Sequence, residues 1–432
     1  MKPSLILISF LLFLSLTLEA QTFVKAKGHQ LWYRNKPYYF LGTNYWYGSL
    51  LALQPDPKRG IERLRKELDF LKRNGITNLR IIAGAEGSGK IIGVERVRPA
   101  LQVEKGIFDT AVLKGMDILL TEMDKRNMKA VIFFSNNWEW SGGFLQYLRW
   151  NGEISDSLFR APMDWNTMQD VISRFYFCTP CKEDYTKQVA LVLNRTNSIS
   201  GKAYKEDPVI MAWELANEPR PMRPEANEAY RQWIASTAAY IKANDQNHLV
   251  TLGHEGEIGT QNMDLYEAIH RDSLIDYLTI HIWPRNWGWY KRDALGEALP
   301  EIIQKSKAYI DKHISLAEKL KKPLVIEEFG LPRDGDAFSP GTPTAIRDQF
   351  YRLIFDMWRQ HRLQNGVLAG SNFWAFKGLA RPVPGQTFWK PGDDFMGDPP
   401  MEEQSLYGVF DNDTSTWTLI REVLKKNNKG LR

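Results

Sequence analysis

The sequence has little cysteine and little excess charge of either sign. Two of its 432 residues are cysteines, and 56 Lys and Arg against 51 Asp and Glu leave a formal charge of +5. Two cysteines exclude a disulfide-rich scaffold. The weak charge excess, without a dense basic run, gives no reason to expect a nucleic-acid or membrane-surface partner. The seven histidines are scattered, with no close pair suited to a metal on one helix face, so we expect no metal and no cofactor.

The two cysteines, Cys178 and Cys181, stand close together in the pattern C-T-P-C. In a reducing compartment this spacing indicates redox chemistry or half of a metal site. The absence of a second pair argues against zinc. For an exported chain we expect a local disulfide between Cys178 and Cys181 that staples a loop.

Long hydrophobic runs are also scarce, and the one that exists lies at the start of the chain. Met1 and Lys2 precede an apolar stretch over 4–18, which is followed by Glu19 and Ala20. This pattern predicts a secretory signal peptide over 1–20, cleaved after Ala20. An uncleaved membrane anchor is the alternative. We expect an exported chain (secreted, periplasmic or held at the cell surface) with no membrane span in the mature part over 21–432.

Short apolar and β-branched segments recur along the chain, separated by stretches with helical periodicity. Eight such segments predict a parallel sheet closed into a single (β/α)8 TIM barrel over 21–432, with long βα-loop insertions. A doubly wound open sheet is the alternative, but no glycine-rich turn follows the first strand. The surplus length lies over 138–185, 283–296 and 378–407. The predicted strands are 39–45, 77–82, 129–134, 209–216, 249–252, 277–282, 323–326 and 366–374.

Charged and aromatic side chains gather where these strands end, which is where barrel enzymes place their working residues. The strand ends supply Arg80, Glu218, Glu255, His281 and Glu328. Two carboxyls at a barrel mouth suit the cleavage of a glycosidic bond, which needs an acid for the leaving oxygen and a carboxylate for the cationic sugar.

Two further acids near these strand ends, Glu327 and Glu214, are interpreted differently from Glu218 and Glu328. Strand alternation puts Glu327 and Glu328 on opposite sides of their strand, so we expect only one of them to face the sugar. Glu214 is expected to be a paired structural acid deeper in the barrel.

The motifs W-E-L-A-N-E-P-R over 213–220 and V-I-E-E-F-G over 325–330 resemble glycoside hydrolase family 5. That family belongs to a clan of retaining (β/α)8 enzymes. The segments F-L-G-T-N-Y-W over 40–46, N-N-W-E-W-S-G-G over 136–143 and H-I-W over 281–283 are similar to its β-mannanase branch, mannan endo-1,4-β-mannosidase. By motif order the resemblance runs from about residue 23 to the C-terminal helix.

The resemblance implies a role for each matching residue. Glu218 matches the acid/base and Glu328 the nucleophile. Asn217 would bind the 2-hydroxyl of the reacting sugar. Arg80 would hold and polarise the nucleophile, and His281 would hydrogen-bond near the acid/base.

Aromatic residues and a second charged pair complete the implied site. Trp374 matches the floor beneath the reacting sugar, and Trp138, Arg220 and Glu255 match positions used for flanking sugars. Trp283 departs from the pattern, because the family usually has a Tyr whose hydroxyl contacts the nucleophile. Either an indole N–H replaces that donor or the contact is missing. Further candidates in the long loops are Trp287, Trp289 and Trp389.

The leading hypothesis is therefore an exported, monomeric retaining glycoside hydrolase that cleaves β-1,4-mannosidic bonds within mannan, glucomannan or galactomannan. Its partner would be a β-mannan-type polysaccharide or oligosaccharide. An exo-acting β-mannosidase or a β-1,4-glucanase of the same clan keeps the chemistry and changes the substrate or the mode of action. A non-catalytic sugar-binding barrel is the third hypothesis.

Overall fold

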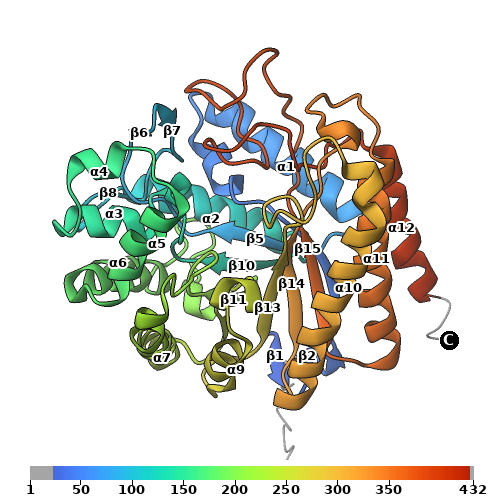
Figure 1. Ribbon diagram of the computed structural model, residues 1–432, viewed down its shortest axis with the longest axis horizontal. Helices are drawn as coiled ribbons and strands as arrows, with labels where there is room; N and C mark the ends of the chain where they lie inside the picture. Colours follow the sequence, from blue (N-terminus) through green and yellow to red (C-terminus); the bar gives the residue numbers. More distant parts are fainter. Residues whose placement is uncertain (1–22, 429–432) are drawn as a thin grey trace, which may run out of the picture.

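The computed structural model describes residues 23–428, and its centre is an eight-stranded parallel sheet (Figure 1). The hydrogen-bonded order is β12-β11-β10-β5-β4-β15-β14-β13. The edge strands β12 and β13 are joined by backbone bonds from Asp276 to Val250 (2.8 Å) and from His281 to Glu255 (3.0 Å), which close the barrel. The strands are β4 (Phe40–Asn44), β5 (Asn78–Ile82), β10 (Lys129–Phe133), β11 (Ile210–Glu214), β12 (Leu249–Thr251), β13 (Leu278–Ile282), β14 (Leu324–Phe329) and β15 (Leu368–Phe373).

One major helix follows each strand and covers the outside of the barrel (Figure 1). The helix after β4 shows how the sequence forms and places such a helix. Asp56 caps its first turn by accepting a hydrogen bond from Arg59 N at 3.1 Å, and Pro57 is its first residue. Its Leu64 and Leu68 are buried against the barrel. The predicted (β/α)8 barrel is confirmed. These helices are α1 (Pro57–Arg73), α2 (Thr110–Asp124), α6 (Thr179–Leu193), α7 (Asn227–Asn244), α9 (Met263–Arg271), α10 (Leu295–Leu320), α11 (Ala345–Gln364) and α12 (Thr414–Asn428).

An N-terminal antiparallel sheet closes the bottom of the barrel. It consists of β1 (Lys25–Lys27), β2 (Gln30–Tyr33) and β3 (Lys36–Pro37). Val24 and Leu31 pack there against barrel side chains such as Met211 and Val325. Because this end is filled by apolar side chains, a ligand can enter only at the carboxyl ends of the strands.

The insertions hold more structure than the sequence predicts. The connection after β10 contains α3 (Gly143–Trp150), α4 (Asp156–Arg160) and α5 (Trp165–Ser173), and the connection after β5 contains two small hairpins. The long segment 378–407 has no helix or strand. The hairpins are β6 (Lys90–Ile91) with β7 (Val94–Glu95) and β8 (Gln102–Glu104) with β9 (Ile107–Phe108). The short helices are α8 (Glu257–Thr260), η1 (Gly48–Leu53), η2 (Glu139–Ser141), η3 (Arg174–Tyr176), η4 (Tyr204–Glu206), η5 (Pro224–Ala226) and η6 (Asp334–Asp336).

Cys178 and Cys181 are joined by a disulfide at the start of α6, where Cys178 is also the N-cap.

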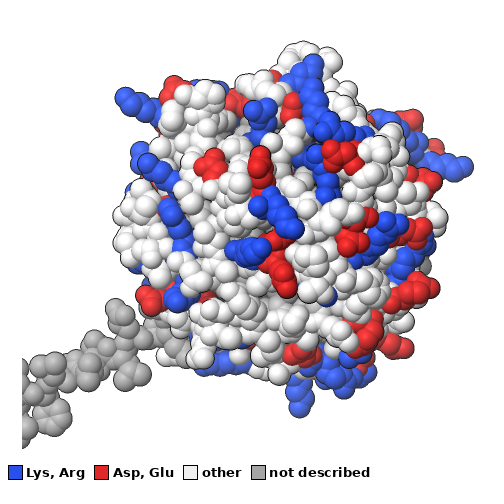
Figure 2. All heavy atoms as spheres, turned by 90° about the vertical axis from the view of Figure 1, so that its left-hand side faces the viewer, with Lys and Arg blue, Asp and Glu red and all other residues white. Residues whose placement is uncertain are grey.

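The predicted signal peptide over 1–20 lies outside the described residues. Within 23–428 no helix is long and apolar enough to cross a membrane. On the face that carries α3 to α6, basic and acidic side chains are interspersed (Figure 2).

Candidate active site

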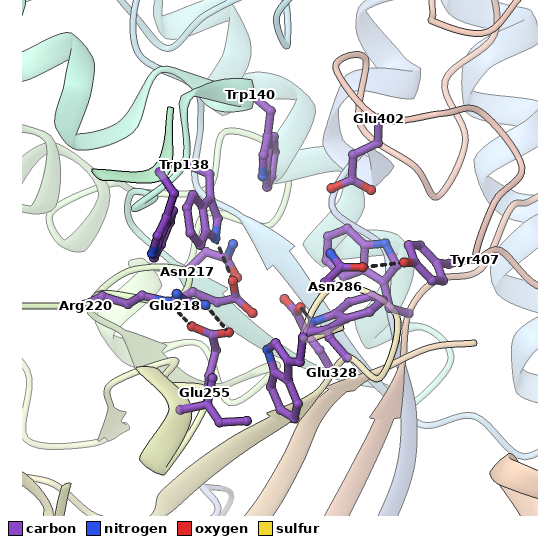
Figure 3. Close-up of a pocket in the computed structure, with 15 residues that line it drawn as sticks. Trp138, Trp140, Asn217, Glu218, Arg220, Glu255, Asn286, Glu328, Glu402 and Tyr407 are labelled. Carbon is purple, nitrogen blue, oxygen red and sulfur yellow. Dashed lines mark hydrogen bonds and ion pairs between the residues drawn. The ribbon is translucent and has the colours of Figure 1, made fainter. Parts of the chain in front are cut away.

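A pocket opens at the carboxyl ends of the strands and collects most of the predicted site residues (Figure 3). Two further predicted residues, Arg80 and His281, do not line it; they are fully buried and bind its carboxyls from within the barrel. All ten predicted side chains therefore belong to one cluster. The eight that line the pocket are Trp138, Asn217, Glu218, Arg220, Glu255, Trp283, Glu328 and Trp374.

Glu218 stands just beyond β11 in a left-handed backbone conformation, with φ of 51°. This conformation is uncommon for a residue with a side chain and is found at functional sites. A backbone hydrogen bond from Glu218 N to Gly253 O, 2.8 Å long, holds it in place. Gly253 has φ of 74°, and a β-carbon there would lie 1.9 Å from Glu214 Oε1. The approach of these two loops therefore requires glycine at 253.

Arg80 on β5 is the hub beneath the pocket. Its Nε and Nη2 donate to the two oxygens of Glu214 at 2.9 and 2.5 Å, and Nη2 also donates to Asn217 Oδ1 at 2.8 Å. Its Nη1 donates to Glu328 and, at 3.1 Å, to Asn44 Oδ1. Burial alone would disfavour the guanidinium, but Glu214 and Glu328 raise the pKa of Arg80, so it stays charged. Glu214 is thus the paired structural acid that the sequence predicts.

The Glu218 carboxyl is held from two sides. Trp138 Nε1 donates to Glu218 Oε2 at 2.6 Å, and His281 Nδ1 lies 2.6 Å from Glu218 Oε1. Burial raises the pKa of Glu218, opposed by the positive charge of Arg220 and by the Trp138 hydrogen bond. Burial and the charge of Arg80 lower the pKa of His281 well below its ordinary value. The neutral ring therefore adds no cation that would drive the proton from Glu218.

Glu328 at the end of β14 is the pocket carboxyl that Arg80 contacts directly. Arg80 donates to its Oε1, and Trp283 Nε1 donates to its Oε2 at 3.1 Å. Burial raises the pKa of Glu328, the charge of Arg80 opposes this, and the charge of Glu218 adds to it. Two carboxyls this close resist simultaneous ionisation. Arg80 contacts Glu328 and not Glu218, and this contact favours the ionised form of Glu328.

The position of Glu327 corrects a prediction. Strand alternation places it on the side of β14 opposite Glu328, but Glu327 Oε2 lies 3.9 Å from Arg80 Nε, and Tyr277 donates to Glu327 Oε1 at 3.3 Å. The pairing of β13 with β14 shifts register between Ile280 and His281, so both neighbouring acids face the barrel interior. Glu328 still lines the pocket, whereas Glu327 does not.

A second ion pair lies on the same side of the pocket as Glu218 (Figure 3). Arg220 donates to both oxygens of Glu255 at 2.5 and 2.6 Å, a bidentate pair that orients its guanidinium plane. The guanidinium lies over the Trp138 ring, 5.0 Å from its centroid. Trp138, Arg220 and Glu255 thus form one wall.

Glu402, Asn286 and Tyr407 lie on the opposite side (Figure 3), and Tyr407 donates a hydrogen bond to Asn286 Oδ1. Burial raises the pKa of Glu402 to about 8; the charge of Lys377 opposes the shift and that of Glu218 adds to it. The sequence does not predict these residues, because 378–407 has no periodic pattern that marks one side chain. The lining also includes Trp140, Trp165, Ile258 and Trp287, of which the sequence suggests only Trp287.

Two other aromatic candidates lie outside this pocket. Trp289 packs against Trp287 with ring centroids 5.2 Å apart but does not line the pocket. Trp389 stacks on Phe395 elsewhere, with centroids 4.8 Å apart.

Within 23–428 one group of acidic and histidine side chains is spaced closely enough to bind a cation, and it consists of Glu218, His281 and Glu328 themselves.

Comparison with known proteins agrees with this geometry. The family model described as glycoside hydrolase family 5, β-mannosidase-like, matches residues 21–430. Putative mannan endo-1,4-β-mannosidase 9 of Oryza sativa subsp. japonica is 29% identical, covering 86% of this chain and 84% of its own. A glycoside hydrolase family 5 mannosidase from Rhizomucor miehei superposes with a TM-score of 0.85 at 31% identity, covering 95% of this chain and 99% of its own.

An endo-1,4-β-D-mannanase from Thermotoga petrophila is less similar, with a TM-score of 0.65 at 25% identity, covering 90% of this chain and 100% of its own. The match to the family model spans nearly the whole chain, including both strand ends that carry Glu218 and Glu328. The chain therefore belongs to glycoside hydrolase family 5 and is a glycoside hydrolase.

Proposed function

We propose that the chain hydrolyses β-1,4-mannosidic bonds with retention of configuration, using Glu328 as nucleophile and Glu218 as acid/base. One observation carries this proposal: an oxygen of Glu218, an oxygen of Glu328 and a ring nitrogen of His281 all lie within 4.8 Å of one another. Retaining glycosidases space their carboxyls by about 5–5.5 Å, whereas inverting ones need about 6.5–9.5 Å to admit a water. The short spacing supports double displacement.

In the first step Glu218 gives its proton to the glycosidic oxygen as the bond to the leaving sugar breaks. A carboxylate oxygen of Glu328 forms a bond to the anomeric carbon, so the reacting sugar becomes covalently attached. In the second step Glu218, now ionised, takes a proton from water, and the water oxygen displaces Glu328. Arg80 and the Trp283 N–H stabilise Glu328 as an anion before the first step and again as it leaves.

Asn217 is the proposed contact for the 2-hydroxyl of the reacting sugar. Its Oδ1 accepts from Arg80 and its Nδ2 donates to Asn136 Oδ1 at 3.0 Å, so the amide is fixed before substrate arrives. Fixed donors and acceptors around the anomeric centre stabilise the transition state at little reorganisation cost. The aromatic rings of Trp138, Trp283 and Trp374 supply apolar faces for the sugar C–H surfaces.

The substrate class is proposed from the comparisons, whose relatives are named as mannan endo-1,4-β-mannosidases and mannosidases.

Glu218→Gln and Glu328→Ala are each expected to abolish nearly all release of reducing ends from linear mannan while the circular dichroism spectrum stays native. Glu225→Gln, an exposed acid after β11, serves as the control and should retain activity. Full activity in both active-site variants would rule out the proposal.

A chain-end mode of action is the second candidate, and the wall formed by Asn286, Glu402 and Tyr407 favours it. This wall stands across the pocket from Trp138 and Arg220, on the side that would hold the non-reducing end (Figure 3). The greater likeness to the Rhizomucor miehei mannosidase than to the Thermotoga petrophila mannanase points the same way. Early products from linear mannan, glucomannan and cellulose, compared side by side, decide between modes: mixed oligosaccharides mean endo action, and mannose alone means chain-end action.

We also propose that the chain is exported. The disulfide at Cys178 supports export, because such bonds persist in oxidising compartments. Mass spectrometry of the N-terminus after expression in a secreting host tests this: a mature chain that begins at Gln21 is expected, and an intact Met1 in the exported protein would contradict it.

A further inference from the structure

Trp165 lines the same pocket as Glu218, yet neither the motifs nor the reaction assigns it a role. It is the first residue of α5, in the insertion after β10, and 45% of its surface is exposed. An exposed indole at the edge of a polar cleft is typical of a ligand contact, because its ring can cover an apolar surface while its N–H remains hydrated.

Helix α5 is bound to the loop that carries the proposed acid/base. Gln169 on the first turns of α5 donates to the backbone oxygen of Met222 at 3.0 Å, four residues after Glu218. Arg223 in the same loop donates to Asn166 Oδ1 at 2.6 Å. The start of α5 is therefore fixed to the loop that follows Glu218, which defines the place of Trp165 relative to Glu218.

Trp165 extends the wall formed by Trp138 and Arg220. The ring centroids of Trp165 and Trp138 are 6.3 Å apart with an interplanar angle of 35°. The Arg220 guanidinium lies 5.0 Å from the Trp138 centroid and 5.5 Å from that of Trp165. Because Glu255 fixes Arg220 by two hydrogen bonds, the three groups form a continuous and rigid surface.

The direction of proton transfer shows which part of a substrate meets this surface. Glu218 protonates the oxygen of the leaving group, so the leaving sugars lie on the Glu218 side of the pocket. Because Trp138 donates directly to Glu218, we expect it to adjoin the first of these sugars. The Trp165 ring is the neighbouring aromatic ring on this wall, with its centroid 6.3 Å from that of Trp138.

We propose that Trp165 is the stacking platform for the second sugar of the leaving group, a β-1,4-linked mannosyl residue of an oligosaccharide. This inference rests on the proposed function. It makes Trp165 a determinant of chain-length preference: substrates whose leaving group is a disaccharide use it, and substrates whose leaving group is a single sugar do not reach it.

The test compares two β-1,4-linked substrates labelled at the reducing end. Release of labelled mannobiose from mannotriose occupies both leaving-group positions, whereas release of labelled mannose from mannobiose occupies only the first. Trp165→Ala is expected to lower the ratio of kcat/KM for the first reaction to that for the second by about tenfold. Trp165→Phe, which keeps a smaller ring over Arg220, is expected to lower it less.

Phe177→Ala is the matched control, since Phe177 is an aromatic residue of the same insertion, 60% exposed and not part of the pocket lining. It should leave the ratio unchanged. An unchanged ratio in Trp165→Ala, or an equal loss on both substrates, would overturn the role of Trp165 while the proposed function stands. If the wild-type enzyme releases reducing ends from linear mannan but cleaves neither short substrate, the role of Trp165 is overturned alone. If it also leaves linear mannan intact, the proposed function fails, and this inference fails with it.

Discussion

Trp283 Nε1 donates a hydrogen bond to Glu328 Oε2 over 3.1 Å. The resemblance to family 5 leads us to expect a tyrosine hydroxyl at this point, and the indole N–H takes its place as donor. Edge-on packing against Tyr407, with centroids 4.8 Å apart, and against Trp374, 5.9 Å apart, orients the indole. Glu328 keeps a second donor although the residue type differs.

Trp283→Phe removes this donor and keeps an aromatic ring. A hydrogen bond to a charged group contributes about 1.5–3 kcal/mol, so kcat/KM is expected to fall about ten- to a hundredfold. The N–H favours ionised Glu328; its loss raises the pKa of that carboxyl, and the acidic limb of the kcat/KM profile moves to higher pH. Trp289→Phe, outside the pocket, should shift neither quantity. An unaltered acidic limb in Trp283→Phe would show that the indole is not the donor.

Gly253→Ala tests the close approach that places Glu218. A β-carbon at 253 would lie 1.9 Å from Glu214 Oε1 and 2.2 Å from Ala216 O, in addition to the strain of φ at 74°. Gly201 has the same φ, and a β-carbon there would have no atom within 4 Å. Gly201→Ala therefore measures the cost of backbone strain alone, about 1 kcal/mol. Gly253→Ala is expected to cost at least about 2 kcal/mol more in urea unfolding and to lower kcat. Equal costs for the two variants would contradict the packing described around Glu214.

The buried carboxyl of Glu86 should make the free energy of unfolding depend on pH. It is buried and accepts from Gly143 N at 3.0 Å and from Gln188 Nε2 at 2.9 Å, and burial raises its pKa from 4.5 to about 7. Because the folded state binds this proton more tightly than the unfolded state, its contribution is fully present below pH 4.5 and is lost as pH rises through 7.

The measurement is the difference in the free energy of unfolding between wild type and Glu86→Gln across this range, which cancels the other titrating groups. The difference should fall by roughly 3 kcal/mol from pH 4.5 to pH 7.5. A difference that stays constant with pH would show that Glu86 titrates normally.

The barrel itself was predictable, because its strands are buried on both faces and appear as short apolar runs. Predicted and observed strands agree to within a few residues, as for 129–134 against Lys129–Phe133. Strand ends were less clear where polar active-site residues continue the strand: β14 extends to Phe329, beyond the predicted end at 326. Helix α10 begins at Leu295 and includes Pro300, so this proline lies inside the helix and does not mark its start.

The positions of the two proposed catalytic carboxyls, Glu218 and Glu328, at the barrel mouth could be predicted because they stand at strand ends and carry recognisable neighbours. Trp165 and Glu402 could not, since each comes from a long connection and reaches the pocket only through tertiary packing. Helix α5 has nine residues, too few for periodicity to distinguish it from loop. The interior position of Glu327 depends on a register shift between two strands, which no local pattern encodes.

The anomeric configuration of the first product tests the central claim most directly. Proton NMR during hydrolysis of p-nitrophenyl β-mannoside resolves the two anomers of mannose before they interconvert. With Glu328 as nucleophile and Glu218 as acid/base, β-mannose should appear first and α-mannose only later by mutarotation. If α-mannose appears first, the reaction inverts, and the covalent role assigned to Glu328 is wrong.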